Sequence, residues 1–471
     1  MRSNIRPIRL KTHAGGTAAG QSPLVELERA VGSCLLFEDA FYESGDSIAQ
    51  RIAVLCDKVD LEDIGALAIW ARNQLKLRHV PLWLALQTVR LNSARKLGSD
   101  VPSRVLQEVI QRPDELSETL ALYWRDGKKP LAAQLKKGLA LAWTKFDAYQ
   151  LGKWNRDSAI KLKDVLFLTH PRPESGDGMG TFAESVDKAG YRRGMAWRDD
   201  EGQGKLWRQV IDGTVPTPDT WEVALSAGQD KKATWERLLS ENKLGIMAAL
   251  MNCRNMLQAG VDTALIGDYI KRKAPGSRAL PFRFLSAAEH APALASDLSD
   301  AMCAAIQGEL PGETCLVLDV SGSMRYGLSS SDGARSKMSR MAAGAVLGVL
   351  LREVTNPCRI FTFSQELVEI ANYRGLALVD AAIRSQEHGG TYLSAALAEV
   401  RRVAPKANRV VVVTDEQSHD GMHDAWAPHS YLINIASYQP ALDTSHGWTR
   451  INGFSERLID WISLHEKGEL L

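Results

Sequence analysis

Residues 315–324 read CLVLDVSGSM, and this stretch decides the fold of the last third of the chain. An apolar run leads directly into an aspartate, two serines and a glycine. Such runs are typical of strands that are buried on both faces of a parallel sheet, because neither face then needs polar residues. A second run, RVVVVTD at residues 409–415, also ends in an aspartate. The two stretches therefore predict buried strands of one parallel sheet.

Helical patterns lie between these two runs, notably over residues 338–353 and 392–403. An alternation of strands and helices predicts a doubly wound, Rossmann-like α/β domain with helices on both faces of the sheet. The sequence pattern changes at PGE, residues 311–313. We therefore place this domain at residues 311–471.

Oxygen-bearing side chains follow the ends of these strands. Asp319 is followed at alternate positions by Ser321 and Ser323, which places three oxygens on one side of a loop. Thr391, which opens a helix, could add a hydroxyl, and Asp415 could add a carboxylate directly or through water. All three loops lie at the carboxyl ends of strands, the edge at which parallel sheets bind ligands. Because oxygen ligands suit Mg²⁺, we predict a site for Mg²⁺ or another divalent cation.

Two other interpretations of the first loop are open. Ser321 and Ser323 could simply hydrogen-bond within a turn, although five oxygen-bearing residues on three loops favour a metal site. Ser321 could instead be a hydrolase nucleophile, with His388 or His419 near the same edge. That interpretation is weaker, because Asp319 and Ser323 stand where the Gly-x-Ser-x-Gly elbow of such enzymes has glycines. We expect binding without catalysis, no catalytic residue, and loop roles for both histidines.

The predicted metal residues resemble, in their order and on their elements, the metal-ion-dependent adhesion site of the von Willebrand factor A domain. The residues that carry the resemblance are Asp319, Ser321, Ser323, Thr391 and Asp415. It implies that few protein ligands bind the metal directly and that octahedral Mg²⁺ keeps open positions for water or a partner's carboxylate. We expect a protein partner at this site, such as a nuclease.

The preceding part of the chain, from residue 24 to about residue 307, has a helical period. Residues 61–70 and 131–139, for example, repeat apolar side chains every three or four positions. Turns rich in Pro, Gly and Asp cut the region into short helices, which suits a stack of helix pairs. We predict an α-helical, HEAT-like solenoid, and an irregular helical bundle is the alternative. Residues 172–204, rich in Gly, Asp and Arg, are expected to form a long surface excursion.

Residues 125–163 carry ten basic and three acidic side chains, an excess of seven positive charges in a chain of net charge +1. The aromatic residues interleaved with them are Trp124, Trp143, Phe146, Tyr149 and Trp154. Phosphates need the charges and unstacked bases could use the rings, so the segment is a candidate RNA-binding surface. Composition alone would instead favour a surface of solvated lysines that covers aromatic residues of the core. The candidate contacts are Lys128, Lys129, Lys136, Lys137, Lys153, Arg156, Lys161 and Lys163.

Four further segments have distinctive sequences. They read LGKW at residues 151–154, KLKDVLFLTHPRP at 161–173, KLGIMAALMNCRNM at 243–256 and SRALPFRFLSA at 277–287. These segments resemble the TROVE module of the Ro RNA-binding proteins, over most of residues 20–310. A TROVE module followed by a von Willebrand A domain is the Ro architecture, so the two resemblances agree.

The resemblance implies a closed ring of HEAT-like helix pairs at residues 20–310, with the A domain bridging its ends. It also implies that small structured, Y-like non-coding RNA binds the basic outer surface and that single-stranded ends of misfolded RNA enter the ring. By motif, Lys153, Lys163 and His170 become RNA-contact candidates. His170 could cap a helix end near a phosphate or stack on a base, and a purely structural helix-end role is the alternative.

Composition argues against several other classes of protein. There is no run of about 18 apolar residues that would predict a membrane span, and the first residues are too polar for an export signal. The six cysteines are scattered without a CxxC pair, which fits a reducing compartment and no structural zinc. We expect a cytoplasmic monomer that makes no membrane contact.

The main prediction is a non-enzymatic, Ro-type RNA-binding protein with a Mg²⁺-binding partner module. The alternative is a protein-interaction scaffold, in which the metal site captures a carboxylate of a partner and the helical module binds protein without RNA. Salt discriminates the two, because an affinity that phosphate contacts dominate falls steeply with salt.

Overall fold

The computed structural model divides the chain into two compact units. One comprises Ala53–Gln229 with Leu471 and is called the helical unit; the other, the α/β unit, comprises Met1–Ile52 and Asp230–Leu470. The described residues are 22–33, 45–172, 183–186, 192–196, 202–226, 228, 230–277, 279–327, 339–435, 442, 444, 446–452 and 458–468.

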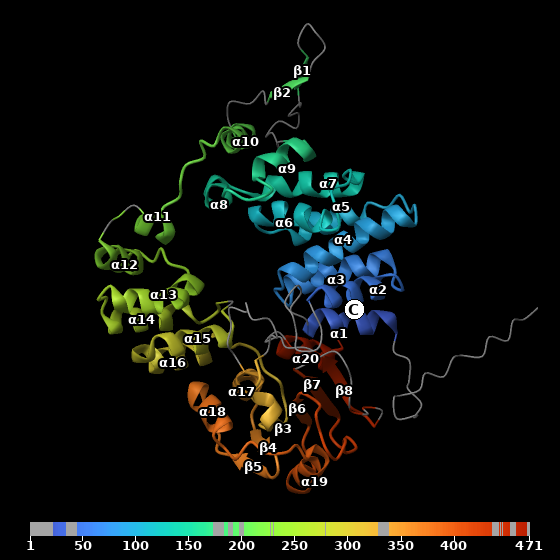
Figure 1. The fold of residues 1–471 in the computed structure, drawn as a ribbon, viewed down its shortest axis with the longest axis vertical. Coiled ribbons are helices and arrows are strands. Elements are labelled where there is room, and N and C mark those ends of the chain that lie inside the picture. The colour runs from blue at the N-terminus through green and yellow to red at the C-terminus, as the bar shows by residue number, and fades with distance from the viewer. Residues whose placement is uncertain are drawn as a thin grey trace, which may run out of the picture. The chain divides into compact units, whose positions relative to one another are not determined.

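The helical unit consists of short helices that pack on helices near them in the chain, such as α3 on α4 and α5 on α7 (Figure 1). Helix α2 (Gly45–Cys56) runs across the division between the units. The helices that follow are α3 (Leu61–Asn73), α4 (His79–Ala94), α5 (Val101–Val109), α6 (Pro113–Tyr123), α7 (Ala133–Ala142), α8 (Ala148–Trp154), α9 (Leu162–Thr169), α10 (Gly202–Asp212) and α11 (Trp221–Ser226).

The apolar periodicity explains this packing. Helix α4 is apolar on nearly all sides and is buried on nearly all sides, which is the expected fate of such a helix in a layered stack. Helices α5 and α7 approach closely because Gly138 has no side chain: a Cβ there would lie 2.7 Å from Cβ of Leu106. The helical region predicted from the sequence is therefore confirmed.

A buried ion pair joins α3 to α6. Nη2 of Arg72 donates to both carboxylate oxygens of Glu115, at 2.7 and 2.8 Å. The side chains are 8% and 0% exposed. Glu115 also accepts the backbone N–H groups of Gln111 and Arg112, at 2.8 and 3.1 Å. Both carboxylate oxygens therefore have partners in the folded state.

The stretch 172–204 contains a small antiparallel sheet that the helical pattern did not predict. Its strands are β1 (Ala183–Val186) and β2 (Arg192–Ala196). Most of the remaining stretch lies outside the described residues, so the expected surface excursion stays a prediction.

The α/β unit contains a six-stranded sheet in the order β5-β4-β3-β6-β7-β8. Neighbouring strands are parallel, except that β5 runs antiparallel to β4. Strands β3 and β6 are buried throughout, as the two apolar runs predicted. The strands are β3 (Thr314–Asp319), β4 (Cys358–Phe363), β5 (Leu367–Ile370), β6 (Arg409–Thr414), β7 (His429–Asn434) and β8 (Thr449–Asn452).

Helices from separate parts of the chain complete this unit. Helix α1 contacts β8 and α20, and α16 contacts α18. The helices are α1 (Pro23–Ser33), α12 (Lys231–Ser240), α13 (Ile246–Gln258), α14 (Thr263–Lys273), α15 (Pro281–His290), α16 (Ala295–Ala305), α17 (Arg340–Val354), α18 (Gly375–Ile383), α19 (Leu393–Val403) and α20 (Leu458–Lys467). The domain boundary between residues 310 and 311 is a matter of sequence and stays a prediction.

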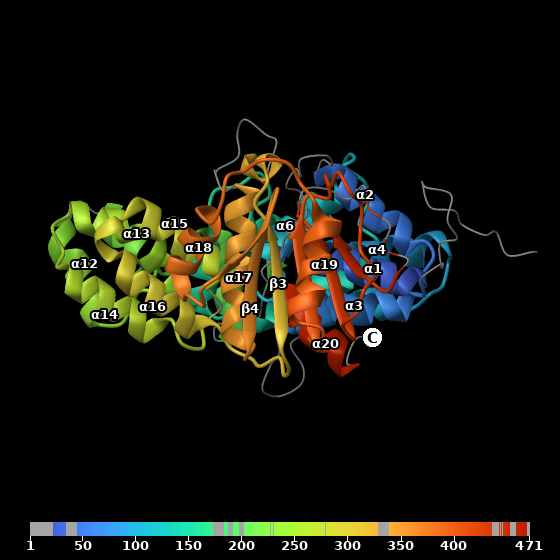
Figure 2. The same ribbon diagram turned by 90° about the horizontal axis from the view of Figure 1, so that it is seen from below.

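Alternate residues of β3 face opposite layers of the unit. Val317 belongs to a core that includes Leu397 of α19. Leu316 and Leu318 lie instead beside Gly348 of α17. In Figure 2, α17 and α19 lie on either side of β3. The doubly wound arrangement predicted for this part is confirmed.

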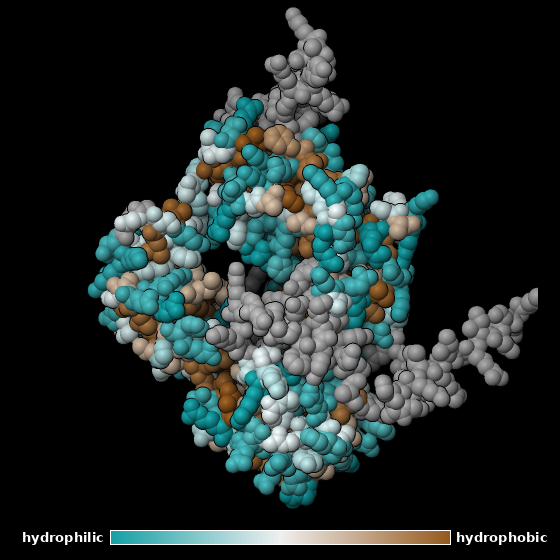
Figure 3. Space-filling view, viewed as in Figure 1, coloured by the Kyte–Doolittle hydropathy of each residue, from teal (hydrophilic) through white to brown (hydrophobic). Residues whose placement is uncertain are grey.

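The helical and the α/β parts of the predicted fold class are thus both found, whereas closure of a ring stays a prediction. Hydrophilic side chains predominate on the face drawn in Figure 3, with apolar side chains in small patches. Within the described part of the chain, no helix is long and apolar enough to cross a membrane.

Candidate metal centre and nucleic-acid interface

Asp319 ends strand β3 at the carboxyl edge of the sheet and is buried. Its Oδ1 accepts the backbone N–H of Ser321 at 2.9 Å, and its Oδ2 accepts the hydroxyl of Thr414 at 2.6 Å. The hydroxyl oxygens of Ser321 and Ser323 lie 3.2 Å apart. The structure therefore brings the aspartate and both serines of the first loop together.

The loop that carries Thr391 lies against the same turn. The N–H of Gly322 donates to the carbonyl oxygen of Gly389 at 3.3 Å. Ser364, at the end of β4, fixes this loop, because its hydroxyl accepts from Gly389 N at 2.9 Å and donates to Gly390 O at 3.0 Å. Thr391 itself is buried. The sequence did not single out Ser364, whose contribution depends on a contact between distant loops.

Asp415 follows β6 and is paired with an arginine. Nη1 of Arg340, at the start of α17, donates to Oδ2 of Asp415 at 2.9 Å, and both side chains are 0% exposed. Nη1 also lies 3.4 Å from the carbonyl oxygen of Ser323. We did not predict this arginine. One signal in the sequence was its position at the start of an apolar helix, where the helix dipole disfavours a positive charge.

Burial of the carboxyl group raises the pKa of Asp319 to about 6. Hydrogen bonds from Ser321 and Thr414 oppose this rise, and the negative charge of Asp415 adds to it. A buried carboxylate beside a second one favours a cation that would offset both charges.

The donor set fits a hard divalent cation. It offers two carboxylates and three hydroxyls, all oxygen, which suit Mg²⁺, Ca²⁺ or Mn²⁺ better than zinc. In the part of the chain that the structure describes, no group of three or more His, Cys, Asp or Glu side chains could hold a metal ion. A cation at this edge would therefore rely on the hydroxyls and on water. The assignment of the five residues as metal ligands stays a prediction.

The two histidines of this edge have partners of their own. Nδ1 of His388 lies 2.7 Å from the carbonyl oxygen of Val320. The ring of His419 stacks on Tyr392 with centroids 5.5 Å apart, and its Nδ1 lies 3.2 Å from the N–H of Thr391. These contacts suit the loop roles expected for both residues.

The candidate RNA contacts all lie in the helical unit, on α7–α9 and the adjoining loops. Lys128, Arg156, Lys163 and His170 are exposed, and Lys153 is half-buried. The other candidates are exposed or half-buried: Lys129, Lys136, Lys137 and Lys161. Lys161 pairs with Asp157 at 2.6 Å, which offsets part of its charge.

The aromatic residues of this segment separate into two groups. Trp143 and Phe146 are buried, so for these two the core interpretation is correct. The centre of a Trp124 ring lies 5.3 Å from Nζ of Lys128. Tyr149 is exposed.

Trp154 is surrounded by cations. The Cζ atoms of Arg112 and Arg156 lie 4.0 and 5.1 Å from the centre of a Trp154 ring, and Nζ of Lys153 lies at 5.8 Å. The sequence did not single out Arg112, because it precedes α6 and lies outside the basic segment. Cations over half-buried rings provide both the charge and the stacking surface that single-stranded nucleic acid uses.

His170 ends α9 with φ of 50°, in the left-handed region. Pro171 follows and cannot continue the helix. The helix-end position expected for His170 is therefore found, and its contact with RNA stays a prediction.

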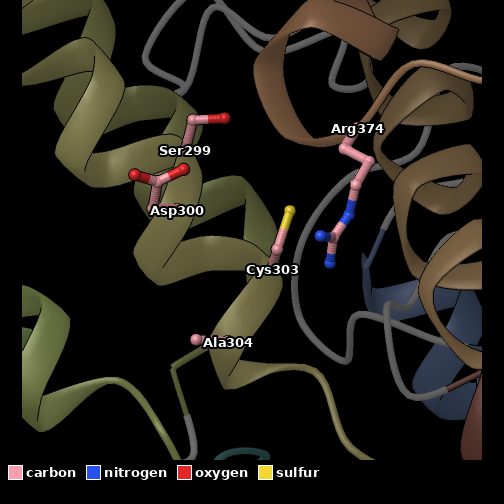
Figure 4. A pocket seen from close by; sticks show the side chains of 5 residues that line it. All are labelled: Ser299, Asp300, Cys303, Ala304 and Arg374. Carbon is pink, nitrogen blue, oxygen red and sulfur yellow. The ribbon is translucent and has the colours of Figure 1, made fainter.

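A cavity of about 390 Å³ lies between α16 and α18 and was not predicted. It is lined by Ser299, Asp300, Cys303, Ala304 and Arg374 (Figure 4). Arg374 is paired with Glu353, and burial raises the pKa of the Cys303 thiol to about 11. The thiol is therefore protonated at neutral pH and is a poor nucleophile.

Comparisons with known proteins match two overlapping stretches of the chain. Residues 212–340 match the TROVE domain, and residues 314–417 match the von Willebrand factor type A domain. Telomerase protein component 1 of Mus musculus is 37% identical over 75 residues, 15% of this chain, and that of Rattus norvegicus is 36% identical over the same length. Each match spans only 3% of the relative's length.

One solved structure matches this fold over almost the whole chain. The crystal structure of the Deinococcus radiodurans RO (RSR) protein matches with a TM-score of 0.59 and 16% sequence identity, over 94% of this chain and 100% of that chain. The likeness concerns the fold, and the two domain matches agree with it. The chain therefore carries a TROVE domain followed by a von Willebrand factor type A domain on the fold of the RO protein.

Proposed function

We propose that this protein is a non-enzymatic, Ro-type RNA-binding protein. The observation that carries the proposal is the cluster of Arg112, Lys153 and Arg156 around Trp154, on a segment with an excess of seven positive charges. Small structured, Y-like RNA binds this basic surface through its phosphates, and unstacked bases use the rings. The TROVE domain and the fold of the RO protein support this assignment.

The finer parts of the proposal follow from the same family. The helical module at residues 20–310 closes into a ring that receives single-stranded ends of misfolded RNA. The domain at residues 311–471 holds Mg²⁺ and binds a protein partner, such as a nuclease, through a carboxylate. The protein acts as a monomer in the cytoplasm.

RNA binding at two salt concentrations tests the proposal. In Lys153→Ala/Lys163→Ala, the affinity for a Y-like RNA should fall and the slope of log K against log salt should flatten by about 1.5, because each lost phosphate contact removes about 0.7 to 0.9. Lys406→Ala/Lys467→Ala is the matched control, since it removes two exposed lysines of the α/β unit. Equal slopes for wild type and the first variant in filter binding would overturn the assignment.

A second function, capture of a protein partner without RNA, is favoured by the surroundings of the candidate metal site. Tyr326, 61% exposed, and Tyr392, 43% exposed, are large apolar side chains near this edge. Such residues are enriched at protein interfaces. A partner that binds the wild type and is lost with Asp319→Ala, in a protein that binds no RNA, would favour this function.

A further inference from the structure

Arg340 brings a fixed positive charge into the candidate metal site. It is the first residue of α17, whose N-terminal turn is capped by the hydroxyl of Ser339, which accepts from Ala342 N at 3.1 Å. Its side chain is 0% exposed, and its guanidinium lies 2.9 Å from Asp415 and 3.4 Å from the carbonyl oxygen of Ser323. A buried guanidinium therefore occupies one side of the set of oxygen donors.

The packing around Arg340 holds it there. Its backbone N–H donates to the carbonyl oxygen of Tyr326 at 2.9 Å. Its Cζ lies 5.9 Å from the centre of the Tyr326 ring, within the range of a cation–π contact. Withdrawal of the side chain would leave Asp415 buried without its counter-ion, which is strongly unfavourable.

The charges of the site then determine how it binds. With both carboxylates ionised, Asp319, Asp415 and Arg340 together carry one negative charge. A divalent cation changes this total to one positive charge in a buried environment. Arg340 therefore weakens the attraction between the site and a dication that binds alone, and the site attracts an anion once the dication is present.

We propose that Arg340 is an internal counter-ion that weakens binding of a divalent cation alone and couples it to binding of a carboxylate from a partner. The proposal rests on the proposed metal site and is independent of RNA binding. Arg340 holds Asp415 by a hydrogen bond, and the added carboxylate restores neutrality when a cation is bound. Coupling is reciprocal, so the partner's carboxylate also binds more tightly in the presence of the metal.

Calorimetry on the full chain tests the proposal with Mg²⁺ as the metal and acetate as the carboxylate. The affinity of the wild type for Mg²⁺ should rise in acetate relative to chloride at equal ionic strength, by a factor between about 5 and 150. In Arg340→Gln, Mg²⁺ alone should bind about tenfold more tightly, and the effect of acetate should shrink. The variant loses one positive charge that opposes the dication and supports the anion.

Two further variants separate charge from packing. Arg340→Lys keeps the positive charge and should keep the effect of acetate on Mg²⁺ affinity. This variant tests the role of the charge if Arg340→Gln does not fold. Arg409→Gln removes another buried arginine, which starts β6 at the opposite end of the sheet and pairs with Glu466. This control should leave the affinity for Mg²⁺ unchanged.

Three results would overturn the proposal: no acetate effect in the wild type, no acetate effect in Arg340→Lys, or equal or weaker Mg²⁺ binding in folded Arg340→Gln. If neither the wild type nor folded Arg340→Gln binds Mg²⁺, the metal site fails together with the inference. The proposal of RNA binding would still stand in that case, because its residues lie in the other unit.

Discussion

The two units each contain a buried arginine–carboxylate pair, and the pairs differ in what surrounds them. In the helical unit, Arg72 donates two hydrogen bonds to Glu115, and two backbone N–H groups also donate to this carboxylate. In the α/β unit, Arg340 makes a single hydrogen bond to Asp415, and the charge of Asp415 adds to the rise in the pKa of a second buried carboxylate, Asp319. Burial alone thus does not distinguish the two pairs. The second carboxylate and the oxygen donors beside Asp415 are what support the proposed metal site.

The largest expected effect breaks the structural pair. Glu115→Ala leaves Arg72 buried without its partner, so the free energy of unfolding of the helical unit should fall by about 3 to 5 kcal/mol in a urea titration. Glu62→Ala, which removes an exposed partner of Arg104, is the control and should cost less than about 1 kcal/mol. Similar losses in the two variants would mean that the buried pair adds little.

The next effect concerns the proposed metal site. Asp319→Ala should abolish stabilisation by Mg²⁺, because hydroxyls do not replace a charged ligand of a hard dication. For the wild type, Mg²⁺ at about 100 times its dissociation constant should add roughly 2.7 kcal/mol to the free energy of unfolding. Without metal, relief of the repulsion between the two carboxylates should offset part of the loss of the hydrogen bonds that Asp319 accepts from Ser321 and Thr414.

Asp420→Ala is the matched control for this experiment. Asp420 lies at the same edge and accepts the N–H groups of Ser394 and Ala395 at the start of α19, but it is outside the predicted metal set. This variant should lose stability and keep the response to Mg²⁺. Persistence of the Mg²⁺ response in Asp319→Ala would remove Asp319 from the metal site.

A smaller effect is expected from pH in the absence of metal. Because the pKa of Asp319 is raised to about 6 in the folded state, from 3.8, the folded protein binds the proton more tightly than the unfolded chain. Stability from this group is present at pH below about 4 and is lost as pH rises through 6. Melting in EDTA should therefore show a gain of about 1 kcal/mol from pH 7 to pH 5 in the wild type, relative to Asp319→Asn. A gain of equal size in Asp319→Asn would assign it to another group.

The smallest effect concerns His170. His170→Asn keeps a residue type that tolerates the left-handed backbone, so the melting temperature should change little. The affinity for structured RNA should fall about fivefold, the value of one hydrogen bond of about 1 kcal/mol. A large loss of melting temperature at unchanged affinity would favour the structural role.

The sequence predicted the elements whose burial is complete. Strands β3 and β6 were predicted correctly because a continuous apolar run is visible in the local sequence, without knowledge of tertiary contacts. Helix α17 begins two residues from its predicted start at residue 338. The two-stranded sheet of β1 and β2 was missed because its strands carry no clear alternation. The short edge strand β5, half-exposed along its length, gave no signal either.

The part of the candidate site that lies at strand ends could be predicted from the sequence, whereas the part that depends on long-range contacts could not. Loops at the carboxyl ends of parallel strands meet at one edge, so Asp319 and Asp415, which lie at the ends of β3 and β6, could be placed near each other from sequence alone. Ser364 and Arg340 could not, because their contacts join residues far apart in the chain. Arg112 reaches Trp154 for the same reason.

If the basic surface of the helical unit binds RNA independently of the metal edge, RNA should copurify with the protein whether or not the metal site is intact. Sequencing and quantifying the RNA that copurifies with the chain of 471 residues tests this. Small structured RNA should be enriched with the wild type and with Asp319→Ala, and depleted with Lys153→Ala/Lys163→Ala. No enrichment with the wild type would exclude RNA binding, and loss of RNA from folded Asp319→Ala would place the metal edge in the RNA site.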